Sequence, residues 1–197
     1  DVAPSRGLGD VYKRQQMLKD ADVDAVILAI GSSPITIKLE GMDKLQHASA
    51  PEVLRHEVCP KGKVAVIGGG LVGLETADTL ATDGCDVTVL EMKDEIGSDL
   101  GSLRKIAVMM KLQQMQVKML PNSKVCKFTE EGIVLEDETL VPCNCAVFAV
   151  GFASNDSHLL VEECEKRQIP CRVIGDAKSA RRALDAIAEG FEAARTL

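Results

Sequence analysis

Short apolar runs alternate with amphipathic stretches along this chain. The most continuous runs have the character of strands that are buried on both faces of a sheet: residues 24–31, 63–67, 86–90 and 145–151. Between the second and third runs, apolar residues recur at helical spacing over residues 71–81, and Gly84 stands where a glycine commonly ends a helix. Strand, helix and strand in this order predict an α/β fold.

Weaker patterns predict the remaining elements. Residues 32–34, Ser-Ser-Pro, are expected to break the first strand, and residues 38–62 to form a connection with one short helix. That helix has a capping box, Ser49 with Glu52, and Pro51 in its first turn. Further helices are expected over residues 16–20, 103–115 and 179–197, and short strands over residues 117–120, 124–129, 132–136 and 171–176, with a brief one near Leu140.

The last of these helices carries a well-defined apolar stripe. Its members recur at the spacing that places side chains on one side of a helix: Ala180, Ala183, Leu184, Ile187, Phe191 and Ala194. We therefore expect this side of the helix to face a core.

The second apolar run leads into a glycine-rich motif. Gly68-Gly69-Gly70-Leu71-Val72-Gly73 follows a strand and opens a helix, the context in which G-x-G-x-x-G indicates dinucleotide binding. Gly68 allows the tight turn, Gly70 lets the backbone approach a pyrophosphate, and Gly73 lets helix and strand pack closely. The phosphates are then expected at the N-terminus of the helix.

The third apolar run ends in an acid, Glu91, about twenty positions after the first glycine. A carboxylate at this place hydrogen-bonds the ribose hydroxyls of the adenosine. Beside a 2′-phosphate it would cost between about 1 and about 4 kcal/mol, depending on the effective dielectric, which disfavours NADPH from fivefold to nearly a thousandfold. NADH is therefore favoured, and NADPH stays possible because Lys93 could reach a phosphate.

The composition bears on the possible partners. The chain has 197 residues, of which 46% are hydrophobic, and a net charge of −7. It contains no basic run and no basic–aromatic stripe, which argues against nucleic acid and against an anionic membrane as partner. No apolar run reaches the roughly 18 residues that would span a bilayer.

The seven cysteines are scattered and odd in number, which favours reduced thiols and a cytoplasmic protein. No C-x-x-C occurs, so this chain encodes neither a thioredoxin-like redox pair nor an iron–sulfur ligand run. Cys143-Asn144-Cys145 comes nearest and is expected to be structural, because it opens an apolar strand. The three histidines show no metal-ligand spacing, and no metal site is expected: His47, His56 and His158.

Several motifs together resemble those of the two-dinucleotide flavoprotein reductases. They are the glycine-rich motif followed by Leu74-Glu75, the paired strand ends Ala29-Ile30-Gly31 and Ala149-Val150-Gly151, and Ile174-Gly175-Asp176 followed by Ala186-Ile187-Ala188-Glu189-Gly190. More narrowly, residues 16–197 are similar to the C-terminal part of the NADH:flavin oxidoreductases related to 2,4-dienoyl-CoA reductase. The two strand ends could mark the places where one domain is inserted into another.

The resemblance implies a domain organisation and a set of binding residues. A Rossmann-like NAD(P)H-binding domain, residues 47–149, would be inserted into a partial FAD-binding domain made of residues 16–46 and 150–197. Asp176 would hydrogen-bond the FAD ribityl chain, with Gly175 giving the backbone room to approach, and Glu75 would lie near the nicotinamide. The expected cofactor-binding residues are Gly31, Gly68, Gly69, Gly70, Leu71, Val72, Gly73, Glu75, Glu91, Gly151, Gly175 and Asp176, and no catalytic acid or base is identified.

One departure from the family concerns the flavin. The family carries a second G-x-G-x-x-G upstream, and residues 1–62 contain none, since Gly7-Leu8-Gly9 does not complete the pattern. Residues 10–15 fit the family poorly, and residues 1–15 are interpreted as a non-native leader. We expect a fragment whose partner is the missing N-terminal region of the same polypeptide. In the related long enzymes that region holds FMN in a barrel domain and a 4Fe–4S cluster.

The expected function is an oxidoreductase fragment, inactive alone, that passes hydride from NAD(P)H to FAD. In the intact enzyme this would feed reduction of an enoate- or dienoyl-type double bond, and the cofactors would perform the chemistry while this chain binds and orients them. Two alternatives stay open. One is a stand-alone NADH-binding module without flavin, and the other is a smaller flavoprotein similar to ferredoxin or thioredoxin reductases, although the absent C-x-x-C counts against a thioredoxin reductase.

Overall fold

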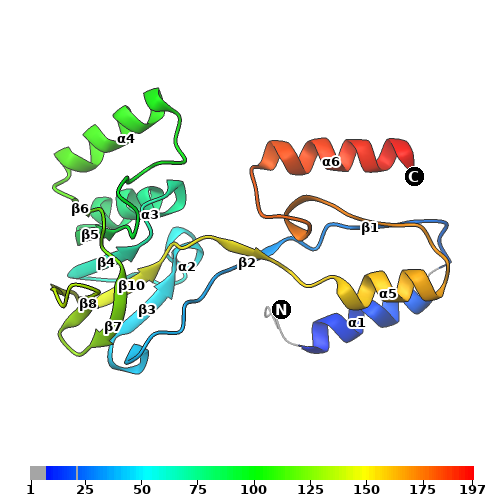
Figure 1. Cartoon of the computed structure of the whole chain (residues 1–197), viewed down its shortest axis with the longest axis horizontal. Coiled ribbons are helices and arrows are strands. Elements are labelled where there is room, and N and C mark those ends of the chain that lie inside the picture. The colour runs from blue at the N-terminus through cyan, green and yellow to red at the C-terminus, as the bar shows by residue number, and fades with distance from the viewer. Residues whose placement is uncertain (1–7, 21) are drawn as a thin grey trace. The chain divides into compact units, whose positions relative to one another are not determined.

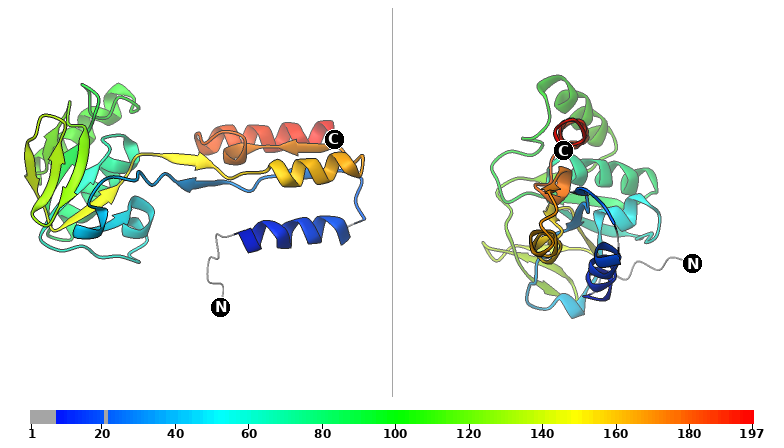
Figure 2. Two further views of the ribbon diagram at one scale, coloured as in Figure 1. Left: turned by 60° about the horizontal axis from the view of Figure 1, so that its bottom comes forward. Right: turned by 90° about the vertical axis from the view of Figure 1, so that its right-hand side faces the viewer.

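The chain forms two compact units (Figures 1 and 2). The computed structural model describes residues 8–20 and 22–197, so residues 1–7 of the expected leader lie outside the described part. The larger unit is Pro34–Gly151, and the smaller combines Asp1–Ser33 with Phe152–Leu197. The larger unit is therefore continuous in sequence and is inserted between the two halves of the smaller one.

A five-stranded sheet forms the centre of the larger unit. Its strands are β3 (Gln46–Ser49), β10 (Cys145–Phe148), β4 (Lys63–Ile67), β5 (Asp86–Leu90) and β6 (Lys118–Leu120), in this spatial order. All neighbours run parallel, with Val64 opposite Val87 on one side and Cys145 on the other. The direction of strand succession reverses at β4, and in open α/β sheets ligands bind outside the carboxyl ends of the strands at such a point.

Three helices cover one face of this sheet: α2 (Ala50–Leu54), α3 (Leu71–Thr82) and α4 (Ser102–Gln114). Val64 and Val66 of β4 belong to the core under these helices, whereas Ala65 and Ile67 belong to the core on the opposite face. Successive side chains of a strand point to opposite faces. A strand covered on both faces is therefore apolar at successive positions, as β4 is from Val64 to Ile67, which explains the continuous runs in the sequence.

A small antiparallel sheet covers the opposite face. It consists of β7 (Val125–Thr129), β8 (Gly132–Leu135) and β9 (Leu140–Pro142), with β8 in the middle. Phe128 of β7 is 2% exposed, and its ring centroid lies 6.0 Å from that of Phe148 in β10. The larger unit thus has three layers: helices, a parallel sheet and an antiparallel sheet.

The smaller unit is built around two short strands. β1 (Val26–Leu28) pairs in parallel with β12 (Cys171–Val173), and α1 (Leu8–Asp20) and α5 (His158–Lys166) pack against them. The core residues of this unit are Leu18, Leu28, Leu160 and Cys164. The 3₁₀ turn η2 (Gly175–Ala177) follows β12 and contacts α6 (Ala183–Thr196).

Two further strands lie where the chain passes between the units. β2 (Ser32–Pro34) pairs with β11 (Phe152–Ser154). The predicted break in the first strand is confirmed, because β1 ends at Leu28, but the sequence does not predict that residues 32–34 form a strand of their own. Pairing with a distant segment produces this strand, and no local pattern signals it.

Most of the predicted elements of the larger unit are confirmed. The capping box at α2 is present, since the backbone N–H and the hydroxyl of Ser49 both donate to Glu52, at 2.7 and 2.6 Å. These bonds lower the pKa of Glu52. The connection over residues 38–62 was predicted to contain one helix, but it also contains η1 (Met42–Lys44) and β3. The polar edge strand β3 has no apolar run that would reveal it. The sequence pattern also did not predict α5 or β11.

The prediction for the apolar stripe of α6 is wrong. Leu184, Ile187 and Phe191 are 76%, 68% and 72% exposed. The helix instead packs through its small residues, and Ala193 is only 2% exposed while a Cβ on Gly175 would lie 3.2 Å from the Cβ of Ala186. Close approach of the backbone at Gly175 therefore selects the side with small residues, although the other side is more apolar.

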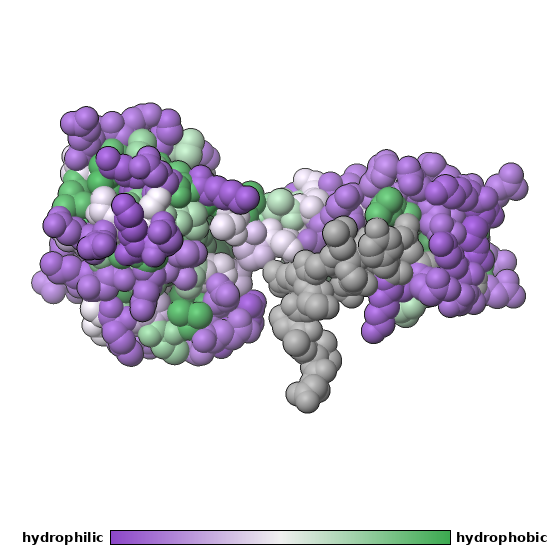
Figure 3. Space-filling view, turned by 90° about the horizontal axis from the view of Figure 1, so that it is seen from below, coloured by the Kyte–Doolittle hydropathy of each residue, from purple (hydrophilic) through white to green (hydrophobic). Residues whose placement is uncertain are grey.

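Most of the surface visible in Figure 3 is hydrophilic. On the face shown in Figure 3, hydrophilic residues cover most of each unit, and apolar residues form separate patches. Among the described helices, none has both the length and the apolar character needed to cross a bilayer.

Candidate functional site

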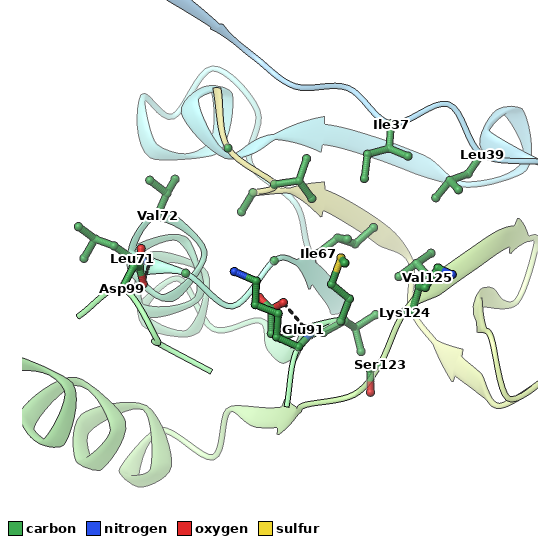
Figure 4. A pocket seen from close by; sticks show the side chains of 18 residues that line it. Ile37, Leu39, Ile67, Leu71, Val72, Glu91, Asp99, Ser123, Lys124 and Val125 are labelled. Atoms are coloured by element: carbon green, nitrogen blue, oxygen red, sulfur yellow. Dashed lines mark hydrogen bonds between the residues drawn. The ribbon is translucent and has the colours of Figure 1, made fainter. Parts of the chain in front are cut away.

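A cavity of ≈ 500 Å³ opens in the larger unit at the carboxyl ends of β4, β5 and β10 (Figure 4). Its volume lies within the range that is usual for small-molecule sites. The glycine-rich motif and the start of α3 form one wall. The lining residues are Ile37, Leu39, Ile67, Gly68, Gly70, Leu71, Val72, Leu90, Glu91, Met92, Lys93, Asp99, Ser123, Lys124, Val125, Ala149, Val150 and Gly151.

Backbone crowding requires two of the glycines. Gly68 has a φ of +112°, and a Cβ at this position would lie 2.4 Å from the carbonyl oxygen of Ala149. A Cβ on Gly73 would lie 1.9 Å from the carbonyl oxygen of Gly68. Without side chains at these positions, β4, β10 and α3 approach one another closely. This packing holds the N-terminus of α3 at the strand ends.

Gly70 is different, because the fold does not crowd it. It caps α3 in an extended conformation with a φ of −79°, and a Cβ there would first meet a side-chain oxygen of Asp99 at 3.2 Å. The next residue, Leu71, donates its backbone N–H to both carboxylate oxygens of Asp99, at 3.1 and 3.0 Å. An anion therefore already lies at the positive end of the helix.

Glu91 lies at the end of β5, beside the glycine-rich motif (Figure 4). One of its carboxylate oxygens accepts the N–H of Gly69 at 2.7 Å, and the other accepts the N–H of Lys93 at 2.9 Å. These bonds fix the carboxylate at the wall of the cavity. The structure thus brings Glu91 and the glycine-rich motif together, as the spacing in the sequence predicts.

The rest of the cavity is mainly apolar. Ile37 and Leu39 face it from the segment before η1, and Val125 faces it from β7 (Figure 4). Two lysines contribute positive charge, and the ammonium of Lys124 is paired with Glu136 at 2.6 Å. An apolar wall with a few polar groups at one end suits a ligand that has a flat ring system and phosphates.

Not every residue expected from the sequence lines this cavity. Gly68, Gly70, Leu71, Val72, Glu91 and Gly151 do, whereas Gly69 and Gly73 do not. Glu75 lies further along α3, is half-exposed and forms an ion pair with Arg104 of α4 at 3.0 Å. Its carboxylate is therefore held on the helical side of the unit.

The remaining expected residues come together in the smaller unit. The parallel pairing of β1 with β12 places their two carboxyl ends side by side. The hydroxyl of Ser32 donates to Asp176 at 3.0 Å, and the backbone N–H of Arg181 donates to the other carboxylate oxygen at 3.2 Å. Gly31 has a φ of +73°, and a Cβ there would meet no atom within 4 Å. The surroundings of Gly31 are therefore open.

Glu189 of α6 fixes the turn at Gly175. Its carboxylate accepts hydrogen bonds from the guanidinium of Arg181 at 2.5 Å, from the N–H of Gly175 at 2.7 Å and from the ammonium of Lys178 at 3.2 Å. The bond from Arg181 and the bond from Gly175 lower the pKa of Glu189 to about 2. In the sequence, Glu189 stands out only as part of Ala-Ile-Ala-Glu-Gly, and nothing there indicates its role.

Three of the cysteines have thiols that burial makes less acidic. Burial raises the pKa values of Cys143, Cys145 and Cys171 to about 11. A thiol with such a pKa stays protonated at neutral pH and is a poor nucleophile. Within residues 8–20 and 22–197, no three His, Cys, Asp or Glu side chains cluster in a way that could hold a metal ion.

Most of the chain matches a known protein family. The model of the family described as pyridine nucleotide-disulphide oxidoreductase matches residues 6–177. This stretch includes the whole larger unit, the glycine-rich motif and Asp176, and it ends before α6 of the smaller unit.

Curated relatives are considerably longer. A bilirubin reductase of Mediterraneibacter gnavus is 35% identical over 92% of this chain and 29% of its own length. A cinnamate reductase of Clostridium sporogenes is 34% identical over 95% of this chain and 29% of its own length. The chain thus spans less than a third of these relatives.

Solved structures share the fold. The complex of 2-naphthoyl-CoA reductase with 2-naphthoyl-CoA has a TM-score of 0.77 and is 23% identical, covering 88% of this chain and 27% of that chain. Histamine dehydrogenase from Rhizobium sp. 4-9 has a TM-score of 0.75 at 14% identity, covering 88% and 30%. The resemblance drawn from the sequence motifs is confirmed, and this chain belongs to the pyridine nucleotide-disulphide oxidoreductase family.

Proposed function

We propose that this chain is the nucleotide-binding part of a flavin-dependent reductase that passes hydride from NADH to FAD. Residues 47–149 bind the nicotinamide dinucleotide, and residues 16–46 with 150–197 contribute to an FAD-binding domain. In a longer protein the electrons would continue to an enoate- or dienoyl-type double bond. The names of the relatives, a cinnamate reductase and a bilirubin reductase, support this class of acceptor.

One observation carries the proposal: the start of α3 opens into the cavity at the carboxyl end of β4. The pyrophosphate would lie over Gly70 and take the N–H of Leu71, which in the free protein donates to Asp99. The adenosine ribose would reach Glu91, whose carboxylate accepts hydroxyl hydrogens well and repels a 2′-phosphate. NADH is therefore the preferred nucleotide.

The smaller unit fits part of an FAD molecule. Asp176 would accept hydrogen bonds from the ribityl hydroxyls, and the open space beside Gly31 leaves room for the chain of the cofactor. Within this sequence, residues 1–62 hold no second glycine-rich motif for the FAD pyrophosphate. We therefore propose that another region of the same, longer polypeptide completes the flavin site.

Two structural features of the smaller unit support this. A sheet of only two strands, β1 and β12, is marginal alone, and parallel sheets are normally covered on both faces. The apolar stripe of α6 is exposed.

When bound, FAD supplies the centre that accepts the hydride, while this chain binds and orients the two cofactors. The FMN and 4Fe–4S cluster of the related long enzymes would lie outside this chain.

Gly70 allows a direct test. A Gly70→Ala substitution leaves the backbone unstrained, since only the flexible side chain of Asp99 lies near the new methyl group. That methyl would block the approach of a pyrophosphate, so we expect NADH binding to fall at least about tenfold, which corresponds to a loss of 1.4 kcal/mol. Gly101→Ala is the matched control, because Gly101 also caps a helix in extended conformation and has no atom near its Cβ.

Titration of the purified chain with NADH, followed by calorimetry, measures both variants against the original. Equal affinity of all three proteins would contradict the proposed site. The proposed binding of FAD is tested separately. The visible absorbance spectrum of FAD is recorded with and without the purified chain, and a change in the spectrum reports binding. Binding of FAD by this chain would contradict the alternative of an NADH-binding module that needs no flavin.

A further inference from the structure

The site that we propose for the dinucleotide already contains two carboxylates of the protein itself. The N–H of Leu71, at the first turn of α3, donates to Asp99, and the N–H of Gly69 donates to Glu91. Figure 4 shows Asp99 beside Leu71 and Glu91 beside the loop. The first backbone N–H groups of a helix have no partner within the helix and are the groups that bind phosphate. Asp99 therefore occupies a place that the pyrophosphate needs.

The two carboxylates differ in their position in the fold and in the hydrogen bonds that they accept. Glu91 directly follows β5, and its second oxygen accepts the N–H of Lys93 at 2.9 Å. Asp99 is exposed and lies in the loop over residues 91–101 between β5 and α4. Its hydrogen bonds to Leu71 are made by the side chain alone. A rotation about the bonds of this side chain would move the carboxylate away from the N–H of Leu71.

The backbone of the loop is held independently of Asp99. Ile96 is 6% exposed in the core under the helices, and the N–H of Gly97 donates to the carbonyl of Gly69 at 2.7 Å. Leu100, on the other side of Asp99, packs against the same core. These anchors keep Asp99 near the site whether or not its side chain is bonded to Leu71.

We propose that Asp99 is an internal competitor for the pyrophosphate and sets the affinity of the site for dinucleotides. In the free protein its carboxylate holds the N–H of Leu71, and it turns away when the pyrophosphate of the ligand takes that N–H. This inference rests on the proposed function, because it concerns the same site. It adds a residue that weakens binding and thereby eases release of the nucleotide after each turnover.

The size of the effect follows from the charges involved. An aspartate that has turned away but stays about 5 Å from a phosphate charge weakens binding roughly fourfold in bulk water and by a few hundredfold at an intermediate dielectric. The ligand must also break the hydrogen bonds between Leu71 and Asp99, which weakens its binding further. Removing the charge should therefore tighten NADH binding at least fourfold.

The test uses two substitutions at this position and one matched control. Asp99→Asn removes the charge at constant size, and Asp99→Ser retains a hydroxyl that can cap α3 without charge. Asp94→Asn removes a charge from an exposed residue of the same loop that does not line the cavity. The dissociation constant for NADH is measured by calorimetry at low and at high salt.

We expect both Asp99 variants to bind NADH at least fourfold more tightly at low salt, and Asp94→Asn to stay within twofold of the original. High salt should narrow the difference, because it screens the charge of an exposed aspartate. Equal or weaker binding by both Asp99 variants would overturn the inference while the proposed function stands. If none of the four proteins binds NADH, the proposed function fails, and the inference fails with it.

Discussion

The carbonyl oxygen of Gly68 occupies the space into which a side chain at Gly73 would grow. A Cβ on Gly73 would lie only 1.9 Å from that oxygen. Gly73 lies in the first turn of α3 and Gly68 directly after β4. The contact therefore joins the strand and the helix that together form the wall of the cavity.

We expect Gly73→Ala to destabilise the protein by about 2 to 3 kcal/mol or more, because backbone atoms must move to admit the methyl group. The control is Gly190→Ala in the interior of α6, where the new Cβ would meet Ile174 at an ordinary 3.8 Å. That change should stabilise by up to about 1 kcal/mol, since alanine favours helix. Urea unfolding followed by circular dichroism measures both, and a stable Gly73→Ala protein would contradict the close approach of α3 and β4.

Glu91 should decide between the two nicotinamide dinucleotides. Replacement by Gln keeps the size and removes the charge that would repel a 2′-phosphate. We expect Glu91→Gln to reduce the preference for NADH over NADPH by a factor between about fivefold and about a thousandfold, depending on how well the site excludes water. Dissociation constants for both nucleotides give the ratio. An unchanged ratio would show that Glu91 does not face the adenosine ribose.

Glu189 should make the stability of the protein depend on pH in the acid range. Its pKa is lowered to about 2 in the folded protein, from about 4.3 in an unfolded chain, because Arg181 and the N–H of Gly175 stabilise the carboxylate. The stabilisation is present above the unfolded pKa and is lost as the pH falls towards 2. We expect the difference in stability between the original and Glu189→Gln to be constant from pH 7 to about 5 and to shrink below that.

The matched control for this prediction is Glu192→Gln on the same helix. Glu192 forms an exposed pair with Arg195 at 3.1 Å, which contributes little. Urea midpoints at a series of pH values compare the three proteins. A Glu189→Gln curve that runs parallel to the original at all pH values would show that the bonds from Arg181 and Gly175 do not hold in solution.

Phe191 and Phe128 should respond very differently to truncation. Phe128 is 2% exposed between the two sheets, and Phe128→Ala should cost about 3 to 5 kcal/mol. Phe191 is 72% exposed, and Phe191→Ala should change the stability by no more than about 0.5 kcal/mol. Urea unfolding of the original protein and of both variants is measured at two protein concentrations. A large, concentration-dependent loss for Phe191→Ala would mean that copies of the chain cover the stripe of α6.

The sequence alone determined the unit formed by β4, α3 and β5. Its signals are local: a continuous apolar strand, glycines at the turn and an apolar helical stripe that ends near Gly84. Local signals suffice here because neighbouring segments of a βαβ unit pack against each other. Gly68, Gly73 and Glu91 could be placed for the same reason, since their positions follow from the strands to which they are attached.

Only the tertiary structure decided the contacts between distant segments. The bond from Ser32 to Asp176 depends on the pairing of β1 with β12, and the bond from Leu71 to Asp99 depends on the path of a loop that Ile96 and Gly97 anchor. The buried side of α6 was also decided in this way. The apolar periodicity of α6 predicted that the side with Phe191 is buried. Close approach of the backbone at Gly175 instead favoured burial of the side with Ala186 and Ala193. Hydrophobic periodicity describes what a helix could bury, and the space beside its partner determines which side it does bury.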